Sequence, residues 1–255
     1  MTWTRWRYIN VPFVLTIAGI LLGTLGSPAL SQLSSEIEVA DFEPPPVGAP
    51  GNRQDAGSRG ASCGFSTLRF LALVPETNVG LTLAERPTFW LYVPCTGGEI
   101  EFELLDEETG ETVYLTTFDV TDGPGIISMP VPEAAPSLET DKMYRWLFHF
   151  WSDNPENLAF VSGVVIREPL TTELKAELED ATPLERMAIY GKNGLWYDML
   201  AEIGQGYRDN PQDEAFTVNW EALLQNPVVG LEDLLSEPLV SCCNAKSIGP
   251  TVQSE

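Results

Sequence analysis

The fold is decided by EIEFEL at residues 99–104, where glutamates alternate with apolar side chains. Successive side chains of a β-strand point to opposite faces, so this pattern predicts a strand with one solvent-exposed face and one buried face. The following DEETG at residues 106–110 predicts a hairpin turn into a second strand at 112–116. Residues 142–151 alternate in the same way, with an aromatic residue at every second position. A two-faced sheet is therefore expected around this stretch.

Further short strands are expected on both sides of this hairpin, at residues 68–74, 88–93, 125–129 and 158–166. Prolines and glycines separate these runs, and short strands with such punctuation are typical of sandwich folds. Residues 63–168 are therefore predicted to form an antiparallel, immunoglobulin-like β-sandwich. An aromatic set on these strands is expected to pack its core rather than to bind sugars: Trp90, Tyr92, Trp146, Phe148 and Phe150.

The spacing of apolar residues changes after Pro169, from two to that of an α-helix. The run TPLE at 182–185 is a strong helix start, because threonine can cap, proline fits the first turn and glutamate can bond back to the cap. Residues 195–208 and 213–224 predict two more helices. We therefore expect an α+β protein in which a helical region, 169–243, follows the sandwich.

One spacing within the helical region resembles a tetratricopeptide repeat. It is carried by Tyr190, Gly194, Trp196, Met199, Ile203, Gly206 and Pro211. Residues 213–224 could begin a second unit. A generic helical hairpin packed against the sandwich accounts for the same spacing equally well, and both interpretations stay open.

The N-terminus has the pattern of an export signal. Two arginines precede an uncharged, mostly apolar run at 11–25, and small residues at 29 and 31 favour cleavage after Ser31. Residues 1–31 are therefore predicted to be a signal peptide, with an uncleaved anchor as the alternative. The chain is expected in the periplasm, the thylakoid lumen or the extracellular space. Beyond the export signal, no membrane association is expected.

Two segments look unstructured. Residues 32–62 are rich in proline and glycine and poor in large apolar residues, which predicts a disordered linker. Residues 244–255 are predicted to be a flexible tail.

The chain is strongly acidic, with 37 acidic against 14 basic residues and a net charge of −23. Such a surface repels phosphate backbones and anionic lipid heads, so neither nucleic acid nor a membrane surface is expected as a partner.

The chain has a single histidine, His149, which argues against most His-based catalysis and most zinc sites. We predict it on the outer or partly covered sheet face, opposite the aromatic set. No cofactor and no resident metal are expected.

Four cysteines are present: Cys63, Cys95, Cys242 and Cys243. None has the C-x-x-C spacing of a zinc or redox motif. In an exported chain, the pairings to consider are Cys63 with Cys95, or one of these with the C-terminal pair. Free buried thiols are the remaining alternative.

The acidic residues give no strong catalytic signal, since exposed turn acids lack the raised pKa that hydrolysis needs. The loops 121–123 and 153–157 carry oxygen ligands that would suit calcium, although ordinary turns account for them more simply.

Three aromatic residues are less obviously part of the core: Trp151, Trp196 and Tyr197. We predict that a binding groove lies near them, where the sandwich meets the helices.

Several motifs together resemble an exported, mainly cyanobacterial family known as domain of unknown function 928. They are Arg59-Gly60-x-x-Cys63, Leu71–Pro75, Pro87–Pro94, Val161–Arg167 and Tyr190…Gly194–Asp198. The resemblance covers residues 58–226 and implies export, a β-rich body and a helical C-terminal part. It implies no reaction, cofactor or catalytic residue. Cys95 stands where the family usually has an aromatic residue, so no family disulfide is carried over.

The function that these observations favour is a non-enzymatic binding or scaffold protein of the cell envelope. Its partner would be an envelope protein, a peptide or a glycan. The alternative is a carboxylate-dependent hydrolase or carbohydrate-active enzyme, which a buried acid pair in a concave site would favour. A calcium-stabilised envelope protein is the third hypothesis.

Overall fold

The alternating segments form strands as expected in the computed structural model, which describes residues 42–55, 69–152 and 158–245. The described strands are β1 (Leu71–Ala72), β2 (Val79–Thr82), β3 (Thr88–Val93), β4 (Glu99–Asp106), β5 (Thr112–Asp119), β6 (Gly125–Pro130), β7 (Met143–Trp151), β8 (Leu158–Arg167) and β9 (Asn244–Ala245). The helices are α1 (Thr172–Glu179), α2 (Pro183–Lys192), α3 (Trp196–Asp209), α4 (Glu214–Gln225) and the short 3₁₀ helix η2 (Glu232–Leu234).

All seven predicted strands are present, and the alternation of β4 is seen directly in its burial. Ile100, Phe102 and Leu104 are buried, whereas the glutamates between them are partly exposed. The sequence did not predict β2 or β9. β2 is short and contains Gly80, and Asn244–Ala245 was expected to begin a loose tail.

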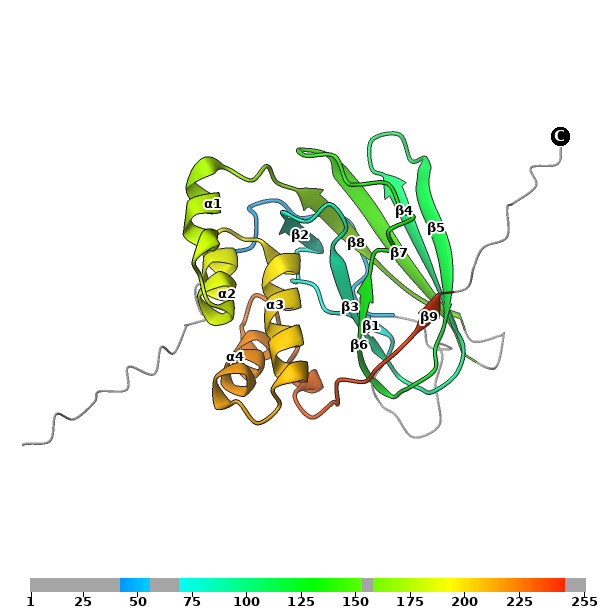
Figure 1. Ribbon diagram of the computed structural model, residues 1–255. Helices are drawn as coiled ribbons and strands as arrows, with labels where there is room; N and C mark the ends of the chain where they lie inside the picture. The colour runs from blue at the N-terminus through cyan, green and yellow to red at the C-terminus, as the bar shows by residue number, and fades with distance from the viewer. Residues whose placement is uncertain (1–41, 56–68, 153–157, 246–255) are drawn as a thin grey trace, which may run out of the picture. The chain divides into compact units, whose positions relative to one another are not determined.

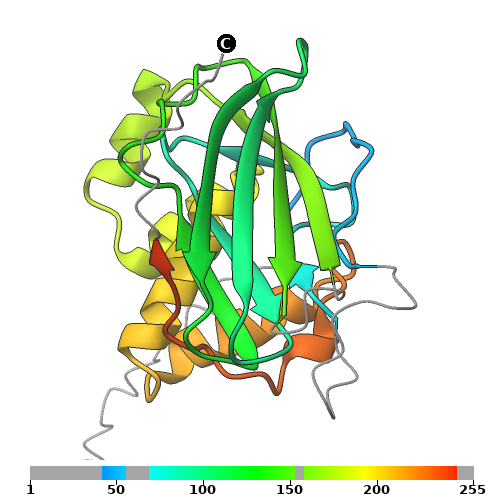
Figure 2. The ribbon, with the colours of Figure 1, turned by 90° about the vertical axis from the view of Figure 1, so that its right-hand side faces the viewer.

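Two sheets face each other, one with the order β2-β8-β7-β4-β5-β9 and one with the order β1-β3-β6. Figure 2 shows the larger sheet from its outer side. All its pairs are antiparallel except β2 with β8, so this sheet is mixed. β2 can run parallel because the chain continues from it into β3 of the other sheet, and no hairpin joins it to β8. The expectation of a purely antiparallel arrangement therefore fails at this edge.

Aromatic side chains fill the space between the sheets. The Phe89 ring lies 5.5 Å from Phe102, 5.6 Å from Trp146 and 5.5 Å from Phe148, measured between ring centroids. All five members of the predicted aromatic core set are at most 2 % exposed, which confirms that prediction. Such contacts hold the sheets together through burial and edge-to-face geometry.

The helices cover the smaller sheet on the side away from the larger one (Figure 1). α2 begins as predicted: the Thr182 side chain accepts a hydrogen bond from the Glu185 amide, and the Glu185 carboxylate accepts one from the Thr182 amide. α3 packs closely on β2 and β3 because glycines leave room there. A Cβ on Gly80 would lie 2.6 Å from the Tyr197 ring, and one on Gly204 would lie 2.5 Å from the Trp90 ring.

Helices and sheets share one hydrophobic core, which includes Trp196, Leu200, Ile203 and Trp220 together with the strand residues. The architecture is therefore α+β, with two sheets and four α-helices in the described part of the chain. Among the described residues, no helix combines the length and the apolar character that crossing a membrane requires.

Part of the predicted linker is ordered against this core. Phe42 is 3 % exposed and its ring lies 5.1 Å from that of Trp196. Arg53 donates hydrogen bonds to the backbone oxygens of Val229 and Gly230. Backbone bridges from Asn52 to Ser162 and from Gln54 to Leu71 add to these contacts, so residues 42–55 are held at several points. The predicted signal peptide, residues 1–31, and the rest of the linker lie outside the described residues.

Candidate functional site

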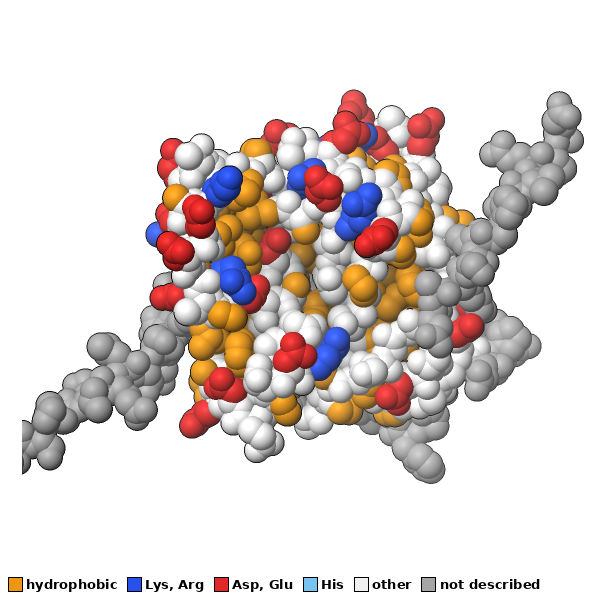
Figure 3. All heavy atoms as spheres, viewed as in Figure 1, with side chains coloured by type: hydrophobic (Ala, Val, Ile, Leu, Met, Phe, Trp, Pro, Cys, Tyr) orange, Lys and Arg blue, Asp and Glu red, His pale blue; other side chains and the backbone are white. Residues whose placement is uncertain are grey.

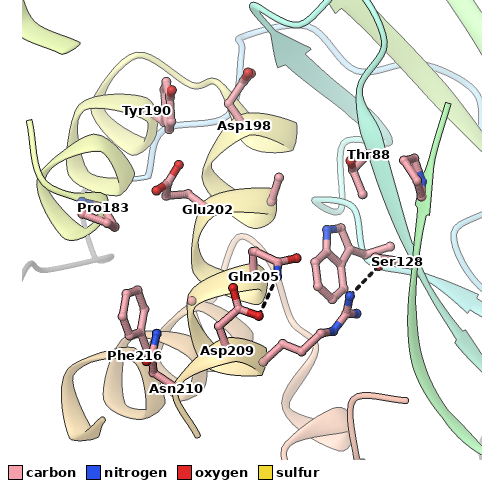
Figure 4. A pocket seen from close by; sticks show the side chains of 15 residues that line it. Thr88, Ser128, Pro183, Tyr190, Asp198, Glu202, Gln205, Asp209, Asn210 and Phe216 are labelled. Atoms are coloured by element: carbon pink, nitrogen blue, oxygen red, sulfur yellow. Dashed lines mark hydrogen bonds between the residues drawn. The ribbon is translucent and has the colours of Figure 1, made fainter. Parts of the chain in front are cut away.

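A groove of about 710 Å³ runs along one face of α3. Figure 4 shows it flanked by Pro183 and Tyr190 of α2 on one side and by Thr88 and Ser128 of the smaller sheet on the other. We call it the α3 groove. It is lined by Thr88, Trp90, Ser128, Pro130, Pro183, Tyr190, Asp198, Ala201, Glu202, Gln205, Gly206, Arg208, Asp209, Asn210 and Phe216.

The floor of the groove is one of the two faces of α3. Its apolar residues Trp196, Met199, Leu200 and Ile203 are buried in the core. Its polar residues fall three or four positions apart and therefore share the other face, where they line the groove: Asp198, Glu202, Gln205, Arg208 and Asp209. Figure 3 shows this side of the molecule, where hydrophobic and charged side chains both lie at and around the hollow.

Asp198 marks one end of the groove. Its carboxylate accepts a hydrogen bond from the Leu83 amide over 2.9 Å and a second from the Thr82 side chain. Burial raises the pKa of Asp198 to about 6, against the lowering effect of these hydrogen bonds. Asp198 therefore titrates near neutral pH, and a cation brought to it would favour its ionised form.

Glu202 lies one helical turn further along and is already paired. Arg186 of α2 donates a hydrogen bond to its carboxylate over 2.6 Å, and this bond raises the pKa of Arg186. Tyr190 stands nearby on α2, and burial together with the charges of Asp198 and Glu202 raises the pKa of its hydroxyl. This end of the groove thus offers two carboxyl groups and an aromatic ring.

Arg208 marks the other end. Its Nη1 donates a hydrogen bond to the Ser128 hydroxyl over 2.9 Å, and its guanidinium carbon lies 5.1 Å from the centre of the Trp90 ring. Burial lowers the pKa of Arg208, and the charge of the adjacent Asp209 opposes that effect. Gln205 donates a hydrogen bond to the Asp209 carboxylate over 2.8 Å (Figure 4). The groove is therefore anionic at one end and carries a cation at the other.

The structure does not bring the three predicted groove residues together in a groove. Trp196 is 0 % exposed and donates a hydrogen bond to the Leu73 backbone oxygen. Tyr197 is 2 % exposed, with its hydroxyl bonded to Trp146. Both lie where helices meet sheets, but in the core. Trp151 is partly exposed at the end of β7, beside His149.

His149 lies on the outer face of the larger sheet, opposite the aromatic set, as predicted. Its Nδ1 is 3.4 Å from a carboxylate oxygen of Glu101, and its ring contacts Trp151 and Phe160.

Of the two loops considered for calcium, 121–123 is described and 153–157 lies outside the described residues. Within the described part of the chain, no group of three or more His, Cys, Asp or Glu side chains is placed to hold a metal ion.

The cysteines are only partly covered by the described residues. Cys242 is bonded to Cys243, a pairing that is not among those expected from the sequence. Cys95 is also disulfide-bonded. Cys63 lies outside the described residues, so the Cys63–Cys95 pairing stays a prediction.

The α3 groove was not predicted from the sequence. The signal that could have shown it is the polar series on α3, from Asp198 to Asp209, at helical spacing. Such a series is read by default as a solvated helix face. Only the packing of α2 on one side and of β3 and β6 on the other turns this face into the floor of a groove.

Fold and groove together define an α+β protein in which a helical layer forms a ligand-sized groove on the smaller of two facing sheets. The model of the family described as Domain of Unknown Function (DUF928) matches residues 54–239. This match spans more than half of the chain, so the chain belongs to the DUF928 family. No curated protein and no solved structure matches it.

Proposed function

We propose that the chain is a non-enzymatic binding protein of the cell envelope that holds an extended ligand in the α3 groove. The observation that carries this proposal is the groove itself. Its volume of about 710 Å³ falls in the range of small-molecule and peptide sites. Apolar side chains such as Phe216 and Pro130 line it together with a few convergent polar groups. Export rests on the sequence pattern of residues 1–31.

The carboxylates of the groove are arranged to hold rather than to react. Glu202 is paired with Arg186, Asp209 accepts a hydrogen bond from Gln205, and Asp198 accepts one from the Leu83 amide. Groups with such partners keep fixed positions, which suits selective binding. The succession of α2, α3 and α4 also has the order expected of one and a half tetratricopeptide-like units beside an immunoglobulin-like sandwich. Both module types often serve recognition, and we use this only as an analogy.

A second candidate function is an acid-dependent hydrolase, and one observation favours it. Asp198 has its pKa raised to about 6, and Glu202 lies one turn away on the same groove floor. One protonated and one ionised carboxyl group are the requirement for general acid and base catalysis of glycoside hydrolysis. Asp198 accepts hydrogen bonds from Thr82, the last residue of β2, and from Leu83, which follows it. These bonds favour a structural role for Asp198 instead.

The test compares ligand binding by the full chain with binding by a variant whose groove is filled. Ala201→Trp places a large side chain on the groove floor, and Ala176→Trp makes the same change on exposed α1, outside the groove. The probes are tetrapeptides of basic, neutral and acidic composition and chitotetraose, measured by titration calorimetry. We expect at least one probe to bind the wild-type chain and the Ala176→Trp variant but not the Ala201→Trp variant.

Two outcomes would contradict the proposal. Binding that survives in the Ala201→Trp variant places the ligand elsewhere. Cleavage of any probe by the wild-type chain, lost in Asp198→Asn and Glu202→Gln, would establish the hydrolase instead.

A further inference from the structure

The Arg208 end of the α3 groove carries hydrogen-bond donors that nothing in the described part of the chain satisfies. Arg208 uses Nη1 on the Ser128 hydroxyl, whereas its Nε and Nη2 are buried without a partner. Trp90, which is 2 % exposed and lines the groove, has its indole Nε1 buried without a partner as well. Buried polar groups are normally paired, so this cluster points to an acceptor supplied from outside.

The unpaired edge of the guanidinium has a specific chemistry. Nε and Nη2 point the same way and form the fork that binds a carboxylate through two parallel hydrogen bonds. The Ser128 bond and the Trp90 ring hold the guanidinium plane in place. An arginine fixed in this way loses little freedom when an anion binds. Nε and Nη2 are covered in the described structure, so an anion reaches them only when the groove side chains over them move aside.

The groove also limits what can carry the anion. Asp198, Glu202 and Asp209 line the same groove, and the whole chain has a net charge of −23. These charges repel a polyanion such as a phosphorylated ligand. A ligand with one carboxylate at Arg208 and a positive group at the Asp198 and Glu202 end would match both ends.

The spacing of the two ends sets the length of the ligand. Arg208 follows Asp198 by ten residues on α3, which corresponds to about 15 Å along the helix axis. An extended peptide rises about 3.3 Å per residue, so about four residues span this distance. Building on the proposed binding function, we propose that the α3 groove recognises the free C-terminal end of a polypeptide, with the terminal carboxylate on Arg208 and Trp90 and a basic group near Asp198 and Glu202.

The experiment uses the full chain and the tetrapeptide Lys-Ala-Ala-Ala, once with a free C-terminal carboxylate and once as the C-terminal amide. We expect the free acid to bind at least about tenfold more tightly than the amide, because the amide cannot accept both bonds of the charged fork. Arg208→Lys keeps the charge but removes the fork, and it should reduce the difference between acid and amide several-fold.

Matched variants separate this effect from misfolding. Arg145→Lys makes the same change on the outer face of the larger sheet, where Arg145 pairs with Glu107, and should keep the preference for the free acid. Ser128→Ala removes only the acceptor that orients Arg208, so it should reduce the preference without changing the core. Ser128→Ala thus tests the proposal even if Arg208→Lys fails to fold.

Each contrary outcome has one meaning. Equal binding of acid and amide, with both lost in Ala201→Trp, overturns the carboxylate proposal and leaves the binding function standing. Arg208-dependent binding of a trigalacturonate but of neither peptide identifies a sugar carboxylate instead and also overturns it. If no probe of either kind binds in an Ala201-dependent way, the proposed binding function itself fails.

Discussion

The indole Nε1 of Trp146 on β7 donates a hydrogen bond over 2.7 Å to the hydroxyl oxygen of Tyr197 on α3. The same hydroxyl donates to the backbone oxygen of Val164 on β8, over 3.3 Å. Both side chains are at most 2 % exposed. This buried hydroxyl therefore links α3 to two strands of the larger sheet, β7 and β8.

Tyr197→Phe is expected to destabilise the chain by about 1–3 kcal/mol, because it leaves the buried Trp146 N–H without an acceptor. The measurement is the free energy of unfolding in urea. Tyr207→Phe is the control, since the Tyr207 hydroxyl makes no hydrogen bond within the described part of the chain. A loss no greater than that of the control would show that the Trp146–Tyr197 bond contributes nothing net.

Gly204→Ala tests the close approach of α3 to β3. Helix propensity alone predicts a gain of about 1 kcal/mol from this change. The new Cβ would lie 2.5 Å from the Trp90 ring, however, and overpacking of this kind costs about 1–3 kcal/mol. We expect a net loss of stability, together with weaker binding in the α3 groove, whose wall Trp90 forms.

Gly191→Ala on α2 is the matched control for that prediction. Its Cβ would meet only the sulfur of Met199, at 3.2 Å, and a methionine side chain can move aside. The variant should melt at the wild-type temperature or slightly above it. If Gly204→Ala behaved like Gly191→Ala, the contact between α3 and Trp90 would be looser than the structure has it.

Asp198 makes stability depend on pH. Its pKa is about 6 in the folded chain against 3.8 for an unperturbed aspartate, so the folded state binds the proton more tightly. This contribution to stability is complete below about pH 4 and is lost as the pH rises through about 6. A shift of this size corresponds to about 3 kcal/mol.

Asp198→Asn removes that titration but keeps an oxygen for the Leu83 amide. The free energy of unfolding of the variant, relative to wild type, should therefore rise by up to about 3 kcal/mol between about pH 4 and about pH 8. Tyr190 and Glu202 also face Asp198 and remain in both proteins. A difference that stays constant over this range would rule out the raised pKa.

The two threonine N-caps, Thr171 of α1 and Thr182 of α2, should contribute differently to the free energy of unfolding. Thr182→Ala removes the capping box of α2, which packs on α3, and should cost about 1 kcal/mol in the free energy of unfolding. Thr171 caps α1 in the same way, but α1 buries no residue. Thr171→Ala should therefore fray α1 without changing global stability, which amide hydrogen exchange can distinguish. Equal losses for both would mean that α1 contributes to the core.

The sequence by itself determined the local structure. Alternation predicted β4 and β7, because a strand with one buried face repeats every two residues, and a hairpin turn predicted β5. Short runs bounded by proline and glycine predicted β3, β6 and β8. The Thr182–Glu185 cap and the aromatic core set were predictable for the same reason, since each depends on neighbours along the chain or on one face of one element. Family membership was also carried by motifs that are local in the sequence.

Tertiary structure decided the rest. β2 is a strand only because β8 lies beside it and Gly80 admits the Tyr197 ring. Residues 42–55 are ordered because they find partners far along the chain, through Phe42, Arg53 and the backbone of Asn52. Trp196 and Tyr197 are core residues, and the polar face of α3 is a groove floor, for the same physical reason. Burial depends on what other elements bring to a surface, and spacing within one element does not contain that information.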